Sequence, residues 1–305
     1  MKIGFAAGNV GSIGTADAIG KIAAYAETLG YHSLWSVERL LFPVKPQSPY
    51  PGTPDGSLPD PYRYSLDPLD TLTFAAASTK TLALGTSILD LPYYNPVLLA
   101  RRLSTLDVLS GGRLRVGFGL GWSLDEMQAT GANMKTRGAQ ADEFVQVLKA
   151  IWTTDPAQFQ GKFYQLPKSF INPKPVQKPH PPIFFAAYAP AAMKRVAEVS
   201  NGWNPAGIPV AGMAQMWASI KQLAQAAGRD PESLQMIIRA NVEVSDKPLP
   251  NERAIFTGTL DQIRDDAIAC RDIGAHELFY DPTFSHGAQS LDNWLALMGQ
   301  LRNLV

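Results

Sequence analysis

The chain has 305 residues, with 27 Lys and Arg against 27 Asp and Glu, so its formal net charge at pH 7 is zero. This balance excludes the surplus of basic charge that nucleic-acid binding and polybasic membrane association require. Apolar residues make up 46% of the chain and charged residues 18%, which excludes a disordered protein and is enough for a large core.

Short β-rich runs alternate with longer helical patterns along the whole chain. Strands are predicted over residues 3–6, 32–37, 82–89, 114–118, 183–187, 202–206, 234–244 and 277–281. Helices are predicted over residues 17–29, 68–79, 95–109, 138–152, 190–199, 210–227, 260–273 and 290–301. This order of units predicts an α/β fold, a single (β/α)8 TIM barrel over residues 1–305. A doubly wound open sheet is the alternative, but Gly8, Gly11 and Gly14 lack the usual G-x-G-x-x-G spacing of such a sheet.

Two proline-rich segments interrupt the alternation. Residues 43–68 hold eight of the 24 prolines and follow the second strand, so a barrel places this rim loop at its C-terminal rim. Long loops there usually cover a binding site, and an inert wrap is the alternative. Residues 153–182 form an excursion before the fifth strand. Their proline-rich end, residues 172–182, is predicted to be a stiff structural linker.

Common catalytic and metal motifs are absent from the sequence. It contains no His-Glu-x-x-His, no Gly-x-Ser-x-Gly and no GxxxxGKS/T, so we expect no metal site, no α/β-hydrolase and no P-loop enzyme. The single cysteine, Cys270, excludes a disulfide framework and fits a reducing compartment. With no signal peptide or membrane span in the sequence, a cytoplasmic protein is expected.

Two of the segments that follow strands have unusual composition. Gly117, Gly119 and Gly121 follow the fourth strand, where they let backbone approach a planar ligand, take positive φ, or keep strand and helix close. Small residues at 186–189 precede a helix start, which suits a phosphate because free N–H groups point outward there.

Several longer stretches together resemble the luciferase-like oxidoreductases. They are residues 67–79, LALGTSI, residues 95–100 and 105–114, GFGLGW, PKPVQKPHPPI and Asn201-Gly202-Trp203. The resemblance is dense over residues 1–205 and implies a TIM barrel that binds a flavin or deazaflavin at its C-terminal rim. The compact length and the stretch LGTSILDLPYYNP are most similar to the branch that uses coenzyme F420, with FMN as the alternative cofactor.

The resemblance implies cofactor contacts from the segments after strands three, four and five. These contacts are Ser87 and Ile88 behind the ring, Gly117, Gly119 and Gly121 beside it, and Ala187, Tyr188 and Ala189 at the phosphate. Tyr188-Ala189 stands where many members of the family have a pair of glycines. This departure is expected to change the details of the phosphate contacts, while the backbone N–H donors of the loop remain.

A second departure concerns the chemistry. Where F420-dependent dehydrogenases of this family commonly have Asp-His after strand two, this chain has Glu38-Arg39. Arginine stays protonated and cannot accept a substrate proton. If a proton moves, Glu38 is the first candidate and His286 the second. A rim salt bridge that only orders the proline-rich loop is the alternative for Glu38-Arg39.

The leading hypothesis is hydride transfer between F420 and an organic substrate, with Arg39 and Trp122 in the substrate pocket. An FMN-dependent monooxygenase that uses O2 and a partner reductase is the second hypothesis. A non-catalytic flavin-binding protein is the third. The family often dimerises, so a homodimer is expected, with neither nucleic acid nor membrane as a partner.

Overall fold

Eight strands form a ring of parallel pairs in the computed structural model, which describes residues 1–305. They are β1 (Lys2–Ala6), β2 (Ser33–Ser36), β3 (Ala83–Thr86), β5 (Leu114–Gly119), β8 (Ile183–Phe185), β9 (Gly202–Trp203), β10 (Gln235–Asn241) and β13 (Glu277–Asp281). Pairing runs β3-β2-β1-β13-β10-β9-β8-β5, and β3 also pairs with β5, which closes the barrel. The predicted (β/α)8 TIM barrel is confirmed.

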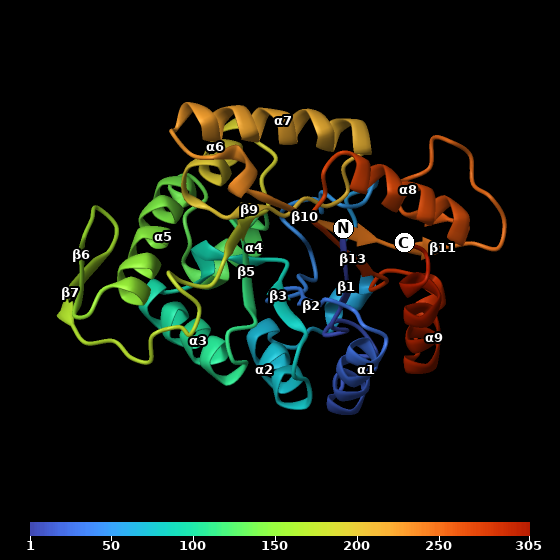
Figure 1. Ribbon diagram of the computed structural model, residues 1–305, viewed down its shortest axis with the longest axis horizontal. Coiled ribbons are helices and arrows are strands. Elements are labelled where there is room, and N and C mark those ends of the chain that lie inside the picture. Colours follow the sequence, from blue (N-terminus) through green and yellow to red (C-terminus); the bar gives the residue numbers. More distant parts are fainter.

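Helices surround this barrel (Figure 1). They are α1 (Ala16–Thr28), α2 (Pro68–Ser78), α3 (Pro96–Leu109), α5 (Arg137–Thr153), α6 (Pro190–Val199), α7 (Val210–Ala226), α8 (Leu260–Asp272) and α9 (Leu291–Arg302). Their ends match the predicted ends to within one residue, because caps and prolines mark them. The Asp67 carboxylate accepts from two N–H groups at the start of α2, and Asn95 does the same for α3.

The structure departs from the predicted elements in four places. The predicted third strand is divided into β3 and β4 (Leu89–Asp90), and the seventh into β10 and β11 (Glu243–Val244), which pairs with β12 (Thr257–Gly258). A short helix, α4 (Leu124–Thr130), follows β5. The excursion before the fifth barrel strand contains an antiparallel hairpin of β6 (Ala157–Gln160) and β7 (Gln165–Ser169), which projects from the barrel (Figure 1). The Glu143 carboxylate on α5 accepts hydrogen bonds from backbone N–H groups in the turn between β6 and β7, and these bonds anchor the hairpin.

Alternate residues of β10 and β13 point into the barrel and stack in three layers. The middle layer is an apolar cluster of four buried side chains: Trp35, Phe184, Ile237 and Phe279. Trp35 and Phe279 are stacked with ring centroids 5.0 Å apart. The layer toward the C-terminal rim is the ion pair between Arg239 and Asp281, whose carboxylate is fully buried.

The layer toward the N-terminal end is a second buried ion pair. Glu277 accepts hydrogen bonds from Ser33, Trp35 and Arg115, and its side chain is 1% exposed. The Arg115 guanidinium lies 5.1 Å from the centre of the Phe184 ring, directly against the apolar layer. Charged residues therefore seal both ends of an apolar barrel interior.

None of the helices is both long and apolar enough to cross a membrane. Cys270 is a buried free cysteine on α8.

Candidate active site

The segment between β3 and β4 lies at the C-terminal rim and is held from across the barrel. The Ser87 hydroxyl donates to Asn204 Oδ1 at 2.7 Å, and Asn204 Nδ2 donates to the Ile237 carbonyl at 2.7 Å. The peptide bond between Ser87 and Ile88 is cis. Ser87 is buried and Ile88 is partly exposed, so the predicted cofactor-side pair is on the rim and held in one position.

The glycines of β5 allow this segment to pack closely. A Cβ atom on Gly117 would overlap the Thr86 carbonyl oxygen, and one on Gly119 would overlap the Ile88 side chain. Gly121 has φ of +68°, which favours glycine, and its N–H donates to Asp90 Oδ1 at 2.6 Å. Protein atoms occupy the space beside Gly117 and Gly119. These two glycines therefore position the Ser87–Ile88 segment.

We expect Gly117→Ala to lower the free energy of unfolding by about 1–3 kcal/mol. Its Cβ meets a backbone oxygen of the neighbouring strand, which cannot rotate away. Gly287→Ala is the control, because Gly287, like Gly117, does not have a positive φ, and the nearest atom to its Cβ position is Ser285 Oγ at 3.9 Å. Urea unfolding followed by circular dichroism measures both variants. A smaller loss for Gly117→Ala than for Gly287→Ala would contradict the steric argument.

The loop after β8 ends at a helix start that has no side-chain cap. Ala187 is buried, whereas Tyr188 and Ala189 are exposed, and Ala189 is the N-cap of α6. The neighbouring helix α7 also lacks a side-chain cap, because its N-cap is Pro209. Pro190 has no N–H and the Ala192 N–H donates to the Ala189 carbonyl, so it is the Ala191 N–H, together with the positive end of the helix dipole, that favours an anion at the start of α6.

Glu38 follows β2, and its two carboxyl oxygens face different partners. Oε2 accepts the Asp90 N–H at 2.7 Å, and Oε1 accepts from the Tyr94 hydroxyl in a short contact. Burial, reinforced by the neighbouring Asp90 carboxylate, raises the pKa of Glu38 to about 8. Burial also raises the pKa of Asp90 to about 7, despite its hydrogen bond from Gly121. Glu38 can therefore carry a proton at neutral pH.

Arg39 is a support for the rim loop. Its side chain is 5% exposed and forms an ion pair with Glu126 on α4, which is buried. Its guanidinium carbon lies 5.4 Å from the centre of the Tyr62 ring and 5.1 Å from that of Trp122. These contacts support the loop-ordering alternative for this position. The place of Arg39 in the substrate pocket stays a prediction.

Aromatic side chains join the rim loop to the barrel. Tyr50 packs on Tyr62 with ring centroids 5.9 Å apart and on Trp122 with centroids 5.4 Å apart. Tyr62 also packs on Phe284, with centroids 5.1 Å apart. Trp122 is partly exposed, and it stays a predicted substrate contact. The rim loop is thus anchored over the C-terminal end of the barrel.

His286 lies on the short helix η4 (His286–Ala288), and no hydrogen bond or ion pair joins it to Glu38. Its side chain is 96% exposed, and its Nδ1 atom lies 3.5 Å from the Glu243 carboxylate. Glu38 contacts Asp90 and Tyr94 instead. The structure therefore shows no contact between the two predicted acid–base candidates, and the catalytic role of His286 stays a prediction.

Several polar rim residues were missed by the sequence analysis. Asp90 and Glu126 are buried carboxylates, and Arg239 and Asp281 form the ion pair beneath the rim. Asn241, at the end of β10, has a buried Oδ1 atom without a hydrogen-bond partner. A carboxylate directly at the end of a predicted strand was the available signal for Asp90.

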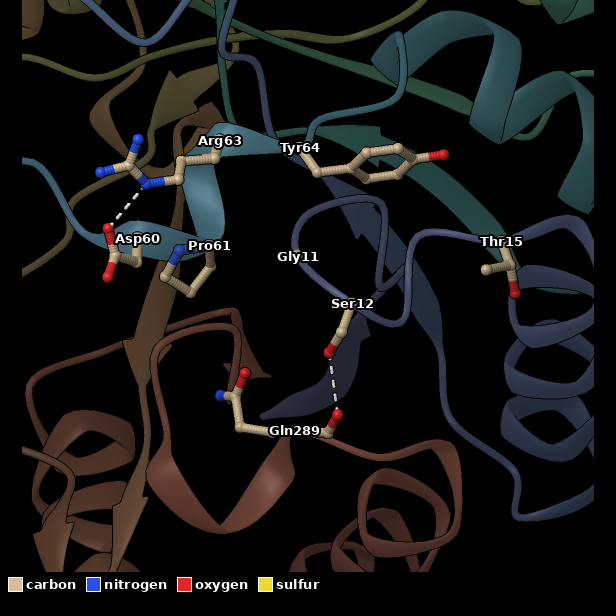
Figure 2. Close-up of a pocket in the computed structure, with 8 residues that line it drawn as sticks. All are labelled: Gly11, Ser12, Thr15, Asp60, Pro61, Arg63, Tyr64 and Gln289. Carbon is tan, nitrogen blue, oxygen red and sulfur yellow. Dashed lines mark hydrogen bonds and ion pairs between the residues drawn. The ribbon is translucent and has the colours of Figure 1, made fainter. Parts of the chain in front are cut away.

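A separate cavity of about 570 Å³ lies beside the rim loop (Figure 2). Its lining comes from the β1–α1 loop, from η1 (Asp60–Arg63) with Tyr64, and from the segment before α9. Ser12 donates to the Gln289 carbonyl across one side, and Arg63 pairs with Asp60 on another. It shares no lining residue with the predicted cofactor contacts.

Comparison with known proteins gives consistent matches. A family model described as luciferase-like monooxygenase matches residues 2–277. An uncharacterised protein of Mycobacterium tuberculosis is 34% identical over 264 residues, which is 81% of this chain and 89% of that protein. An FMNH(2)-dependent dimethylsulfone monooxygenase of Pseudomonas putida is 35% identical over 155 residues, 50% of this chain and 42% of that protein. An F420-dependent glucose-6-phosphate dehydrogenase of Amycolatopsis mediterranei is 28% identical over 207 residues, 67% of this chain and 56% of that protein.

Among solved structures, a monooxygenase from Streptomyces bottropensis superposes with a TM-score of 0.81. The alignment covers 100% of this chain and 98% of that protein at 22% identity, so it bears on the fold alone.

Proposed function

The chain belongs to the luciferase-like monooxygenase family, and from this we propose that it is an oxidoreductase that transfers a hydride between coenzyme F420 and a small organic substrate. The observation that carries the proposal is Glu38, a carboxyl group at the C-terminal rim whose pKa of about 8 keeps it protonated at neutral pH. Reduction of an electrophilic carbon requires such a donor for the neighbouring heteroatom.

The residues at the rim fit a coenzyme that has a ring and a phosphate. The start of α6, with Ala187, Tyr188 and Ala189 before it, would offer the Ala191 N–H and the positive end of the helix dipole to the phosphate. The buried, unpartnered Oδ1 atom of Asn241 offers an acceptor to a ring N–H. When bound, the reduced coenzyme supplies a hydride to the substrate carbon.

The chain's own residues would orient the coenzyme and exclude water. Ser87 and Ile88 would support the ring from behind, Gly117 and Gly119 would hold that segment in place, and Gly121 would hold Asp90. Trp122 and the anchored rim loop would cover the substrate. Glu38 would donate its proton to the substrate heteroatom. The resulting carboxylate would be stabilised by the Asp90 N–H and the Tyr94 hydroxyl.

An FMN-dependent monooxygenase with O2 and a partner reductase is the second candidate. The similarity to the dimethylsulfone monooxygenase supports it, because the identity of 35% over 155 residues exceeds that to the F420-dependent dehydrogenase. The two relatives therefore support different cofactors.

Fluorescence titration of the purified protein with F420, and separately with FMN, tests the proposal. Saturable binding of F420 with weaker binding of FMN is the expected result. Preferential binding of FMN would replace the proposal with the monooxygenase. Tight coenzyme binding without turnover of any substrate panel would support a non-catalytic flavin-binding protein.

Ala191→Asp is expected to weaken coenzyme binding about tenfold, a loss of roughly 1.4 kcal/mol. Ala191 is exposed in the first turn of α6, where a carboxylate repels the coenzyme phosphate. Ala191→Asn changes the size of the side chain almost equally without charge and serves as the control. The same titration measures both variants, and equal weakening by both would rule out an electrostatic cause.

The proposal also includes the organisation of the protein. Residues 1–305 would act as one TIM-barrel unit that forms a cytoplasmic homodimer and needs neither nucleic acid nor membrane. Leu98 and Leu109 on α3 are each 63% exposed, which offers an apolar face for a second copy. The molar mass measured by light scattering after size-exclusion chromatography tests whether the protein is a dimer.

A further inference from the structure

Three carboxylates meet at the rim beside one guanidinium. They are Glu38 after β2, Asp90 on β4 and Glu126 on α4, and the guanidinium is that of Arg39. We propose that Asp90 is a positioning residue that keeps a proton on the Glu38 carboxyl group. The inference rests on the proposed function, because it explains how Glu38 would hold the proton that the reaction consumes.

The hydrogen bonds are distributed unequally over the three carboxylates. Glu126 accepts from the Arg39 guanidinium, from the N–H groups of Leu40 and Leu41, and from the Tyr93 hydroxyl. Its negative charge is therefore compensated on every side.

The carboxyl groups of Asp90 and Glu38 accept fewer hydrogen bonds, and neither forms an ion pair with an arginine or lysine. Asp90 accepts one backbone N–H, from Gly121, and Glu38 accepts one backbone N–H and one hydroxyl. Two neighbouring carboxylates without a dedicated cation cannot both ionise at low cost, so the pair retains one proton at neutral pH.

The contacts also indicate which residue and which atom hold this proton. Asp90 is linked to Glu38 through its backbone N–H, which occupies Glu38 Oε2. Oε1, which contacts the Tyr94 hydroxyl, is the position left for the proton; once protonated it would donate to the Tyr94 oxygen, where the ionised carboxylate accepts from the Tyr94 O–H. Asp90 itself keeps its Oδ1 atom on the Gly121 N–H, which favours the ionised form of Asp90. Its charge then disfavours ionisation of Glu38.

The remaining charged and titratable groups around the pair act in known directions. The Glu126 carboxylate opposes ionisation of both members, and Arg39 and Arg137 favour ionisation of Asp90. The hydroxyl of Tyr94 favours ionised Glu38, and Tyr93 lies near Asp90 and Glu126. Removing Asp90's charge and removing Tyr94's hydroxyl must therefore shift the titration of Glu38 in opposite directions.

The test is a pH titration of the purified full-length protein labelled with carbon-13 at the glutamate carboxyl groups. The Glu38 signal is identified as the one missing from Glu38→Gln. In the parent protein it should titrate well above the ordinary value of 4.5. Asp90→Asn should move the midpoint down by about one pH unit, and Tyr94→Phe should move it up.

Asp70→Asn is the matched control, because Asp70 is an exposed aspartate on α2 and the substitution removes the same charge. It should leave the midpoint unchanged. A midpoint near 4.5 in the parent protein overturns the proposal without any variant, and so does an unchanged or raised midpoint in Asp90→Asn. The titration needs no coenzyme. If the protein failed to bind a coenzyme, the proposed function would be wrong, but the effect of Asp90 on the titration of Glu38 could still be measured. Coenzyme binding with an ordinary Glu38 titration would remove only the role of Asp90.

Discussion

Glu277→Ala is expected to lower the free energy of unfolding by about 3–5 kcal/mol, because it leaves the Arg115 guanidinium without a carboxylate inside the barrel, with the Gln235 side chain as its remaining acceptor. The Glu277 side chain is 1% exposed and that of Arg115 is 12% exposed, so water compensates little of the lost charge. Ser33 and Trp35 also lose their shared acceptor. Urea unfolding followed by circular dichroism gives the free energy.

Two further variants separate charge from packing. Asp17→Ala breaks an exposed ion pair with Lys21 on α1 and should cost no more than about 0.5 kcal/mol. The double variant Arg115→Met, Glu277→Leu removes both charges and should recover most of the stability, because an apolar pair of similar size needs no desolvation. A loss below about 1 kcal/mol in Glu277→Ala would show that Arg115 is solvated in the barrel.

The barrel interior could not be predicted from the sequence, although the elements that build it could. Helix ends were predictable because side chains such as Asp67 and Asn95 satisfy N–H groups a few residues away. Arg115 and Glu277 are 162 residues apart and meet only when the barrel closes. Within a strand, an alternating charged residue is typical of a solvent-exposed face, and it indicates a buried pair only when its partner is known.

The candidate site was predictable where it depends on strand ends. Ser87 lies near the end of a predicted strand and Glu38 directly follows one, and the structure places both at the C-terminal rim. Glu126 was not predictable, because α4 has only seven residues, too few for a periodic apolar pattern. His286 also follows a strand, but its exposure depends on how the chain leaves the barrel, which sequence spacing does not indicate.

Arg39, the residue after Glu38, is part of the support of the rim. An arginine cannot exchange a proton with substrate at neutral pH. Here it neutralises Glu126 and lies against the rings of Tyr62 and Trp122. Arg39 therefore stabilises the cover over the barrel, and under the proposed function Glu38 would carry the proton.

Arg39→Ala is accordingly expected to lower the free energy of unfolding by about 3 kcal/mol, because Glu126 is left buried without its cation. The three other donors to Glu126 keep the loss below that of a fully uncompensated charge. Loss of the contacts with Tyr62 and Trp122 should also loosen the rim loop, so limited proteolysis is expected to cut within residues 43–68 at a higher rate.

The matched control is Arg63→Ala, in the rim loop itself. Its side chain is 66% exposed, pairs with exposed Asp60 and lies 4.2 Å from the centre of the Phe42 ring, so its removal should cost less than about 1 kcal/mol. Arg39→Lys keeps the charge but not the planar group that lies against the two rings. It should therefore restore part of the stability and less of the protease resistance. If Arg39→Ala and Arg63→Ala proved equally stable and equally resistant, the rim loop would be held by its aromatic contacts alone, and the buried ion pair would have no part in covering the site.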